Sequence, residues 1–150
     1  MSELALKLIR EAKEQRLTRL DLGNCGLTKL PDELFELVWL EELILAETWL
    51  DYQNTEKSWV YRISNNKGKS NRLQNISSKF KKLTGLRKLI AADQYNNHFE
   101  YLEALTELEM LYIRHSKIND LSFLTKNKKL QYLCIRSAGI RHLRSINELS

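Results

Sequence analysis

The chain has 150 residues, of which 43% are hydrophobic and 29% are charged, with a net charge of +5. This length fits one domain with a sizeable core, and the composition is that of an ordinary soluble globular protein. No apolar run approaches the roughly 20 residues of a membrane helix, and residues 1–16 lack the apolar stretch of a signal peptide. The two cysteines, Cys25 and Cys134, are too few for a disulfide framework. We therefore expect a cytoplasmic protein that does not enter a membrane.

Residues 2–16 are predicted to form an amphipathic helix. Ser2 can cap the N-terminus of this helix with its hydroxyl group. One apolar stripe runs along the helix, formed by Ala5, Leu8, Ile9 and Ala12. We expect the stripe to cover the open end of the core that follows.

A six-residue pattern, Leu-x-x-Leu-x-Leu or a close variant, recurs along the rest of the chain. Its copies are LTRLDL from Leu17, LEELIL from Leu40, LRKLIA from Leu86, LEMLYI from Leu108 and LQYLCI from Leu130. A further apolar residue follows the third position by five residues in four copies, at Leu27, Leu50, Ile118 and Ile140. Such spacing fits neither one helix nor one strand, and it is typical of a turn of a solenoid. One turn cannot bury its leucines alone, so several turns must stack into a continuous core.

The copies begin 23, 46, 22 and 22 residues apart, and the long interval needs an explanation. A hidden repeat beginning at Ile63 would place Asn66 and Gly68 at core positions, which argues against it. Residues 73–86 instead match residues 27–40 position for position. We interpret residues 51–72 as an insertion into the second repeat. Within it, SWVYRIS alternates and is followed by NNKG, which predicts a short excursion or hairpin.

The repeated pattern resembles the leucine-rich repeat family over nearly the whole chain. The resemblance implies an α/β solenoid of about five coils, with a parallel β-sheet on the concave face and an N-terminal capping helix. We expect a single domain over residues 1–150, with repeats at 17–39, 40–85, 86–107, 108–129 and 130–150. The asparagine that the family carries at the corner of each repeat is replaced by Cys25, Thr48, Gln94, Ser116 and Ala138.

Two subclasses of the family share finer features with this chain. The opening ALKLIREAKEQRLTRLDLGNCGLTKLP is similar to the N-terminal repeat segment of bacterial cytoplasmic proteins, including Roco-like GTPases. The later units resemble the internalin-like subclass. The last repeat stops at Ser150 without a polar cap, so we expect a piece of a longer protein. The alternative is that something else covers that end, for example a second copy of this chain. The 150 residues contain no GxxxxGK[ST] sequence, so nothing here binds GTP by that mechanism.

Residue types that carry catalysis or bind metals are not grouped in the sequence. His98, His115 and His142 are scattered, and none belongs to a cluster with metal-ligand spacing. No Gly-x-Ser-x-Gly elbow occurs. We expect no enzymatic activity, no cofactor and no metal site.

Two surfaces are candidates for binding a partner. The first is the concave face, because strand alternation directs every second side chain toward it. Its candidate residues are Ile90, Met110, Tyr112, Arg114, Tyr132 and Arg136, a composition typical of interface hot spots. The alternative is that Tyr and Ile at these positions merely suit strands.

The second candidate surface is the insertion, which is rich in large aromatic residues. They are Trp49, Tyr52, Trp59 and Tyr61. The alternative is that these rings pack the insertion back onto the repeats, in which case we still expect at least one ring to be exposed. Trp59 and Tyr61 are the binding candidates here.

Charge is distributed in blocks along the chain. Residues 30–56 hold eight acids and no Lys or Arg, residues 57–88 hold ten Lys or Arg and no acid, and residues 89–111 hold five acids and no Lys or Arg. Stacked repeats turn these blocks into neighbouring bands of opposite charge.

These features favour a non-catalytic module that binds another protein through its concave face. One alternative is a nucleic-acid-binding repeat domain that uses the basic band, 57–88, although the acidic bands beside it make nucleic acid an unfavourable partner. Another alternative is the regulatory arm of a larger GTPase-like protein.

Overall fold

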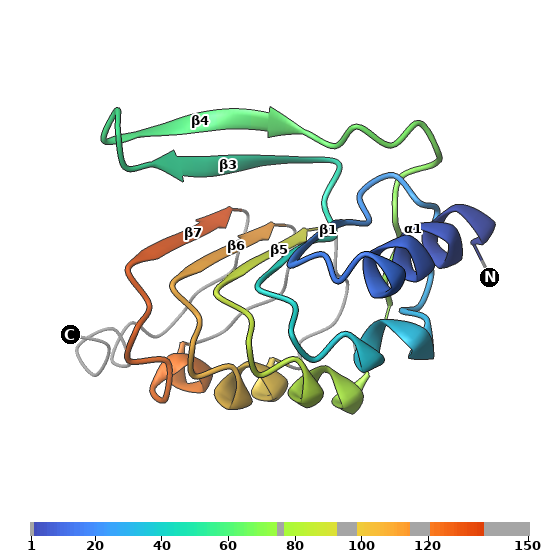
Figure 1. Cartoon of the computed structure of the whole chain (residues 1–150). Coiled ribbons are helices and arrows are strands. Elements are labelled where there is room, and N and C mark those ends of the chain that lie inside the picture. Colours follow the sequence, from blue (N-terminus) through green and yellow to red (C-terminus); the bar gives the residue numbers. More distant parts are fainter. Residues whose placement is uncertain (1, 75–76, 93–98, 115–120, 137–150) are drawn as a thin grey trace.

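The computed structural model describes residues 2–74, 77–92, 99–114 and 121–136 (Figure 1). It begins with the helix α1 (Glu3–Glu14), where the Ser2 hydroxyl accepts a hydrogen bond from the Ala5 main-chain N–H at 3.3 Å. Ala5, Ile9 and Ala12 are buried in the core, and Leu8 packs against it. The predicted helix, its N-cap and its apolar stripe are therefore confirmed.

Five short parallel strands form one sheet. They are β1 (Arg19–Asp21), β2 (Glu42–Ile44), β5 (Lys88–Ala92), β6 (Met110–Arg114) and β7 (Tyr132–Arg136), in the order β1-β2-β5-β6-β7. The second leucine of each copy of the pattern pairs with its counterpart in the neighbouring strand, as Leu20, Leu43, Leu89, Leu111 and Leu133. The repeat spacing therefore predicted the strand positions and their pairing.

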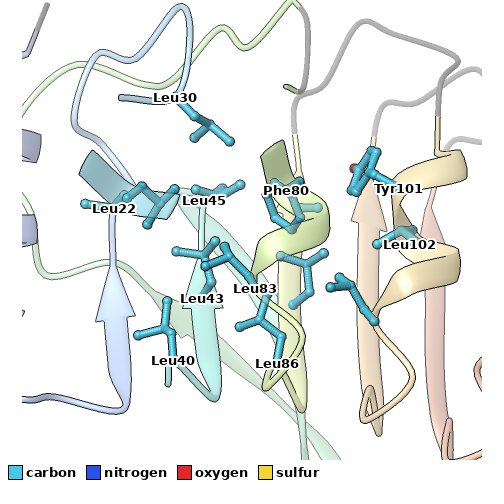
Figure 2. Close-up of a cluster of buried hydrophobic side chains, with 14 of the residues drawn as sticks. Leu22, Leu30, Leu40, Leu43, Leu45, Phe80, Leu83, Leu86, Tyr101 and Leu102 are labelled. Carbon is cyan, nitrogen blue, oxygen red and sulfur yellow. The ribbon is translucent and has the colours of Figure 1, made fainter. Parts of the chain in front are cut away.

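Short 3-10 helices carry the chain back between strands, and Figure 1 shows them in a row along one side of the sheet. They are η1 (Asp32–Glu36), η2 (Ser78–Lys82), η3 (Glu100–Ala104) and η4 (Ser122–Leu124). Their apolar side chains meet the inward leucines of the strands in one continuous core, part of which appears in Figure 2. Phe80 of η2 contacts both the Phe35 ring, at 6.2 Å between centroids, and the Tyr101 ring, at 4.9 Å. Burial raises the pKa of Tyr101 far above its ordinary value.

The insertion begins earlier than the sequence indicates. The strands β3 (Thr48–Gln53) and β4 (Ser58–Ile63) pair antiparallel as a hairpin, so the excursion includes residues 48–50 as well as 51–72. The hairpin turn lies at residues 54–57, ahead of the SWVYRIS stretch and not at NNKG. Lys57 in this turn has a positive φ of 51°. The predicted hairpin is confirmed, with corrected bounds.

Leu50 therefore does not take the core position that its spacing from Leu45 suggests. It lies on β3 and packs, half-buried, against the apolar residues between the hairpin and the sheet. Leu73, which is fully buried, enters the main core directly after the insertion, as the match between residues 73–86 and 27–40 implies. Ile118 and Ile140 lie outside the described residues, as does the C-terminal end for which self-association is one alternative.

The segment from Ser64 to Arg72 brings the chain back along the first two repeats. Ser64 Oγ donates a hydrogen bond to Asp21 Oδ1 at 2.9 Å, and Asn66 Nδ2 donates to the carbonyls of Asp21 and Gly23, both at 2.9 Å. Gly68 approaches so closely that a Cβ there would lie 2.3 Å from the Asn24 carbonyl oxygen. The insertion is therefore tied to the solenoid along its return path as well as at its start.

Candidate protein-binding surface

The hairpin lies over the side of the sheet that faces away from the 3-10 helices (Figure 1). In Figure 1, β3 lies nearer to the sheet and β4 is the outermost strand. A second apolar cluster fills the space between hairpin and sheet. Its buried members are Ile44, Ala46, Trp49, Ile90, Met110 and Tyr112. The hairpin therefore occupies the surface on which the sequence predicted a partner.

Three of the predicted binding residues are buried by this arrangement. Ile90 is 0% exposed, Tyr112 is 1% exposed and Met110 is 4% exposed. Strand alternation does direct them away from the main core, as predicted, but Trp49 and Leu50 of β3 pack against the cluster they form. The prediction that these three side chains are open to a partner is wrong, because a segment of the same chain covers them.

Of the other predicted residues on the sheet, two contact the hairpin and one is exposed. Tyr132 stacks on Tyr52 of β3 with ring centroids 4.3 Å apart, and its hydroxyl donates to Asn54 Oδ1 at 2.6 Å. Arg114 Nη1 donates to the Thr48 hydroxyl at 3.0 Å. Arg136 pairs with Arg114 in the register of β7 and β6 and is exposed. Tyr132 and Arg114 thus hold the hairpin in place.

Charged side chains fix the hairpin near the first strands. Lys88 Nζ lies 2.6 Å from Asp51 Oδ1 and 3.7 Å from Glu42 Oε1. Arg62 Nε lies 3.8 Å from Asp51 Oδ2 on the neighbouring strand, and Arg19 Nε lies 3.2 Å from Glu42 Oε1. These groups line a groove of about 420 Å³ between hairpin and sheet. Acids and bases in the groove pair with one another, so its walls are largely neutralised.

The outer strand β4 carries the largest exposed apolar side chains on the hairpin. Trp59 is 39% exposed, Tyr61 is 58% exposed and Ile63 is 60% exposed. The sequence analysis singled out Trp59 and Tyr61 but missed Ile63. The alternation in SWVYRIS could have identified it, because Ile63 continues the same period of two. Trp59 also contacts Tyr52, with ring centroids 5.4 Å apart. This contact holds the Trp59 ring in position on the hairpin.

Oppositely charged blocks of the sequence meet between neighbouring repeats. Lys79 of the basic block lies 2.7 Å from Asp32, and Arg87 lies 2.9 Å from Glu109. The pairing lowers the pKa of Asp32 and raises that of Arg87, in each case chiefly through the hydrogen bond between the partners. Arg62, Lys79, Arg87 and Lys88 of the basic block therefore pair with acids of this same chain.

The described part of the chain contains no cluster of three or more His, Cys, Asp or Glu side chains able to hold a metal ion. Nor does any helix within the described ranges have the length and apolar character needed to cross a membrane. Cys25 and Cys134 are both free thiols.

Several solved structures are similar to this chain, including two internalins and a leucine-rich repeat protein, although no family model and no curated protein matches its sequence. Internalin C2 from Listeria monocytogenes is 23% identical with a TM-score of 0.70, over 95% of this chain and 52% of its own. An internalin, InlF, from the same organism is 22% identical with a TM-score of 0.62, over 95% of this chain and 41% of its own. A leucine-rich repeat protein of Leptospira interrogans is 16% identical with a TM-score of 0.63, over 99% of this chain and 38% of its own.

The chain thus spans about half, or less, of the length of the structures that it matches. At these identities the likeness concerns the fold and not the activity. Together with the parallel sheet and the N-terminal helix, it shows that this chain has the fold of leucine-rich repeat proteins.

Proposed function

We propose that this chain is a non-catalytic protein-binding module whose binding surface is the hairpin rather than the covered side of the sheet. The observation that carries the proposal is the exposure of Trp59, Tyr61 and Ile63 together on β4. Aromatic side chains of this size are enriched at the centres of protein interfaces, because they offer a large rigid surface at a small cost in conformational entropy. Leucine-rich repeat folds suit this role because their stacked repeats form a stiff support.

The anchoring of the hairpin supports the same proposal. The Tyr52–Tyr132 stack, the Lys88–Asp51 ion pair and the Arg114–Thr48 hydrogen bond hold β3 from three strands of the sheet. A partner would then meet a surface whose side chains are already ordered, which lowers the free energy lost on binding.

The test is affinity capture from the native lysate with the intact chain as bait. The Trp59→Ala/Tyr61→Ala variant should lose its specific partners, since truncating a central aromatic residue commonly costs about 2 kcal/mol of binding. Leu17 and Val38 are exposed apolar residues away from the hairpin, so Leu17→Ala/Val38→Ala is the matched control and should retain the partners.

Retention of every partner by the hairpin variant would contradict the proposal. If an Arg136→Ala variant lost the partners instead, the exposed end of β7 would be the binding surface. Circular dichroism of all variants checks that a loss of capture does not reflect unfolding.

Two finer interpretations remain proposals of the same kind. The chain could serve as the regulatory arm of a larger GTPase-like protein, and a P-loop sequence elsewhere in the same reading frame would support this.

A cytoplasmic location is supported by the free thiols of Cys25 and Cys134, since reducing compartments keep thiols unpaired. Fractionation of the native cells, with detection by antibody, tests the location.

A further inference from the structure

The outer edge of β4 offers main-chain groups that pair with no other strand in the described part of the chain. The hairpin is a two-stranded sheet, so among the described residues β4 pairs only with β3. The Ser64 N–H donates to the Glu47 carbonyl at 2.8 Å, which makes residues 47 and 64 a hydrogen-bonded pair. Hydrogen-bonded pairs alternate along an antiparallel ladder. Ser58, Val60 and Arg62 therefore bond toward β3, and the main-chain groups of Trp59, Tyr61 and Ile63 point outward.

The three residues with outward main-chain groups are also the three with exposed apolar side chains. A strand added along this edge would satisfy their N–H and C=O groups, and its own side chains would contact Trp59, Tyr61 and Ile63. A helix could not satisfy the same groups, since its main chain is bonded internally. The geometry therefore favours an extended segment as the occupant.

The charged side chains near this edge indicate which net charge the bound segment should carry. Residues 57–72 contain five Lys or Arg, all of them exposed, and no acid. Lys57 lies in the turn before β4, and Arg62 lies on β4, where 47% of its side chain is exposed although Asp51 is 3.8 Å away. Lys67, Lys69 and Arg72 follow on the return segment. A second copy of this chain would bring two such segments side by side with no acid between them, which is unfavourable. A segment that carries Asp or Glu would instead be attracted.

We propose that β4 binds an extended acidic segment of a partner protein, which joins the hairpin as its third strand. The proposal rests on the proposed function, because it names the class of partner that the hairpin would take. The fixed position of β3 supports it, since an edge that is already ordered loses little entropy on pairing. Edge strands with free main-chain groups are the usual sites of such pairing.

The probe is a fluorescent peptide of about eight residues, slightly longer than the six-residue strand β4, that alternates Glu with Val. Its counterpart alternates Lys with Val. Fluorescence polarisation should show binding of the acidic peptide and at least about tenfold weaker binding of the basic peptide.

Two substitutions at one position separate main-chain pairing from side-chain contact. Tyr61→Pro removes an outward N–H without breaking a bond to β3, whereas Tyr61→Thr removes the ring and keeps the N–H. We expect the proline variant to bind the acidic peptide at least about tenfold more weakly than the threonine variant. Equal binding by the two variants would overturn the pairing and leave the proposed function standing.

A measurement on the unchanged chain covers the case in which Tyr61→Pro fails to fold. Addition of the acidic peptide should slow the hydrogen exchange of the Trp59, Tyr61 and Ile63 amides, as measured by NMR. Binding without protection of these amides would overturn the proposal.

Other occupants of the edge would give different results. A dimer in sedimentation velocity that Tyr61→Pro dissociates would assign the edge to a second copy. A mixed-sequence oligonucleotide that displaces the acidic peptide and binds more tightly would assign it to nucleic acid. No binding of either peptide, with partner capture still dependent on Trp59 and Tyr61, would reject the acidic strand but not the hairpin as the binding surface.

Discussion

Asn71 lies in the inserted segment, yet it bonds the main chain of two repeats. Its amide donates to the carbonyls of Leu22 at 2.8 Å and Leu45 at 2.9 Å, and its side-chain oxygen accepts from the Leu27 N–H at 2.9 Å. The side chain is 5% exposed. An asparagine side chain therefore does bond the main-chain groups of the turns after β1 and β2. It does not come from the corner of the repeat, however, because it lies more than 40 residues after Leu27.

We expect Asn71→Ala to lower the free energy of unfolding by about 2 to 5 kcal/mol, because it leaves buried main-chain groups without partners. Urea unfolding followed by circular dichroism measures the change. The exposed Asn65 provides the control, and Asn65→Ala should have an effect of less than about 0.5 kcal/mol. Similar losses in the two variants would show that the three hydrogen bonds of Asn71 contribute little.

Cys25 makes the free energy of unfolding depend on pH in the alkaline range. Burial, with a smaller effect of the Asp21 charge, raises the pKa of its thiol from 9.0 to about 11. In the unfolded chain the thiol ionises near its ordinary value, whereas in the folded chain it stays neutral until higher pH. The unfolded state therefore binds fewer protons above pH 9, and stability falls as pH rises from 9 toward 11.

Cys25→Ala should remove the part of this loss of stability that comes from the thiol. Between about pH 8 and pH 10.5, the decrease in the free energy of unfolding should be smaller than in the wild type by about 2 kcal/mol. Urea titrations at both pH values measure it. Cys134→Ala is the control and should change the decrease less, since Cys134 is half-buried and the positive charge of Arg136 counteracts the rise in its pKa.

At the scale of elements, the hairpin replaces a binding surface with a second core. Tyr112 shows the difference most directly. On an open sheet its ring would point into solvent and could be removed with little effect on folding. Here it is fully buried between β6 and the hairpin, beside Trp49 and Ile90. The same side chain is therefore part of the packing and not of the outer surface.

Tyr112→Ala should destabilise the fold by about 3 to 5 kcal/mol, as expected for the loss of a buried ring. Tyr61→Ala removes the same ring from a site that is 58% exposed, so it should cost less than about 1 kcal/mol. Chemical unfolding of the two variants compares them under identical conditions. If Tyr112→Ala were as stable as Tyr61→Ala, the hairpin would not be packed on the sheet in solution.

At the scale of the whole molecule, the charge blocks of the sequence become contacts between repeats. The Lys79–Asp32 and Arg87–Glu109 pairs each join one repeat to the next. These pairs are exposed, so each contributes little to stability. Their main consequence is that the charges of Lys79 and Arg87 are compensated by acids of the same molecule.

We therefore expect only weak binding to a mixed-sequence oligonucleotide. The affinity should fall steeply with salt and be lost near physiological ionic strength, because it depends on exposed bases that face phosphates. Fluorescence anisotropy at several salt concentrations measures this. Tight binding that survives at physiological salt, and is abolished when Lys79, Lys81 and Lys82 are changed to Glu, would support a nucleic-acid-binding function instead.

The repeating part of the fold could be predicted from local patterns in the sequence. Leu20, Leu43, Leu89, Leu111 and Leu133 lie in register because each repeat must bury the same few positions against its neighbours. The capped helix α1 was predictable for a similar reason, since its N-cap and apolar stripe are local patterns. The exposure of Trp59 and Tyr61 also agrees with the expectation that at least one aromatic ring of the insertion remains open.

Which apolar side chains are covered depends on contacts between distant segments, and no local pattern predicts it. Alternation along a strand tells which side of a sheet Ile90 and Tyr112 face, but not what lies over that side. The covering segment is held by contacts between distant residues, such as Asn54 and Tyr132, which are 78 positions apart. Nothing in a local pattern distinguishes a ring that binds a partner from one that binds the chain's own hairpin, because burial of apolar surface stabilises both in the same way.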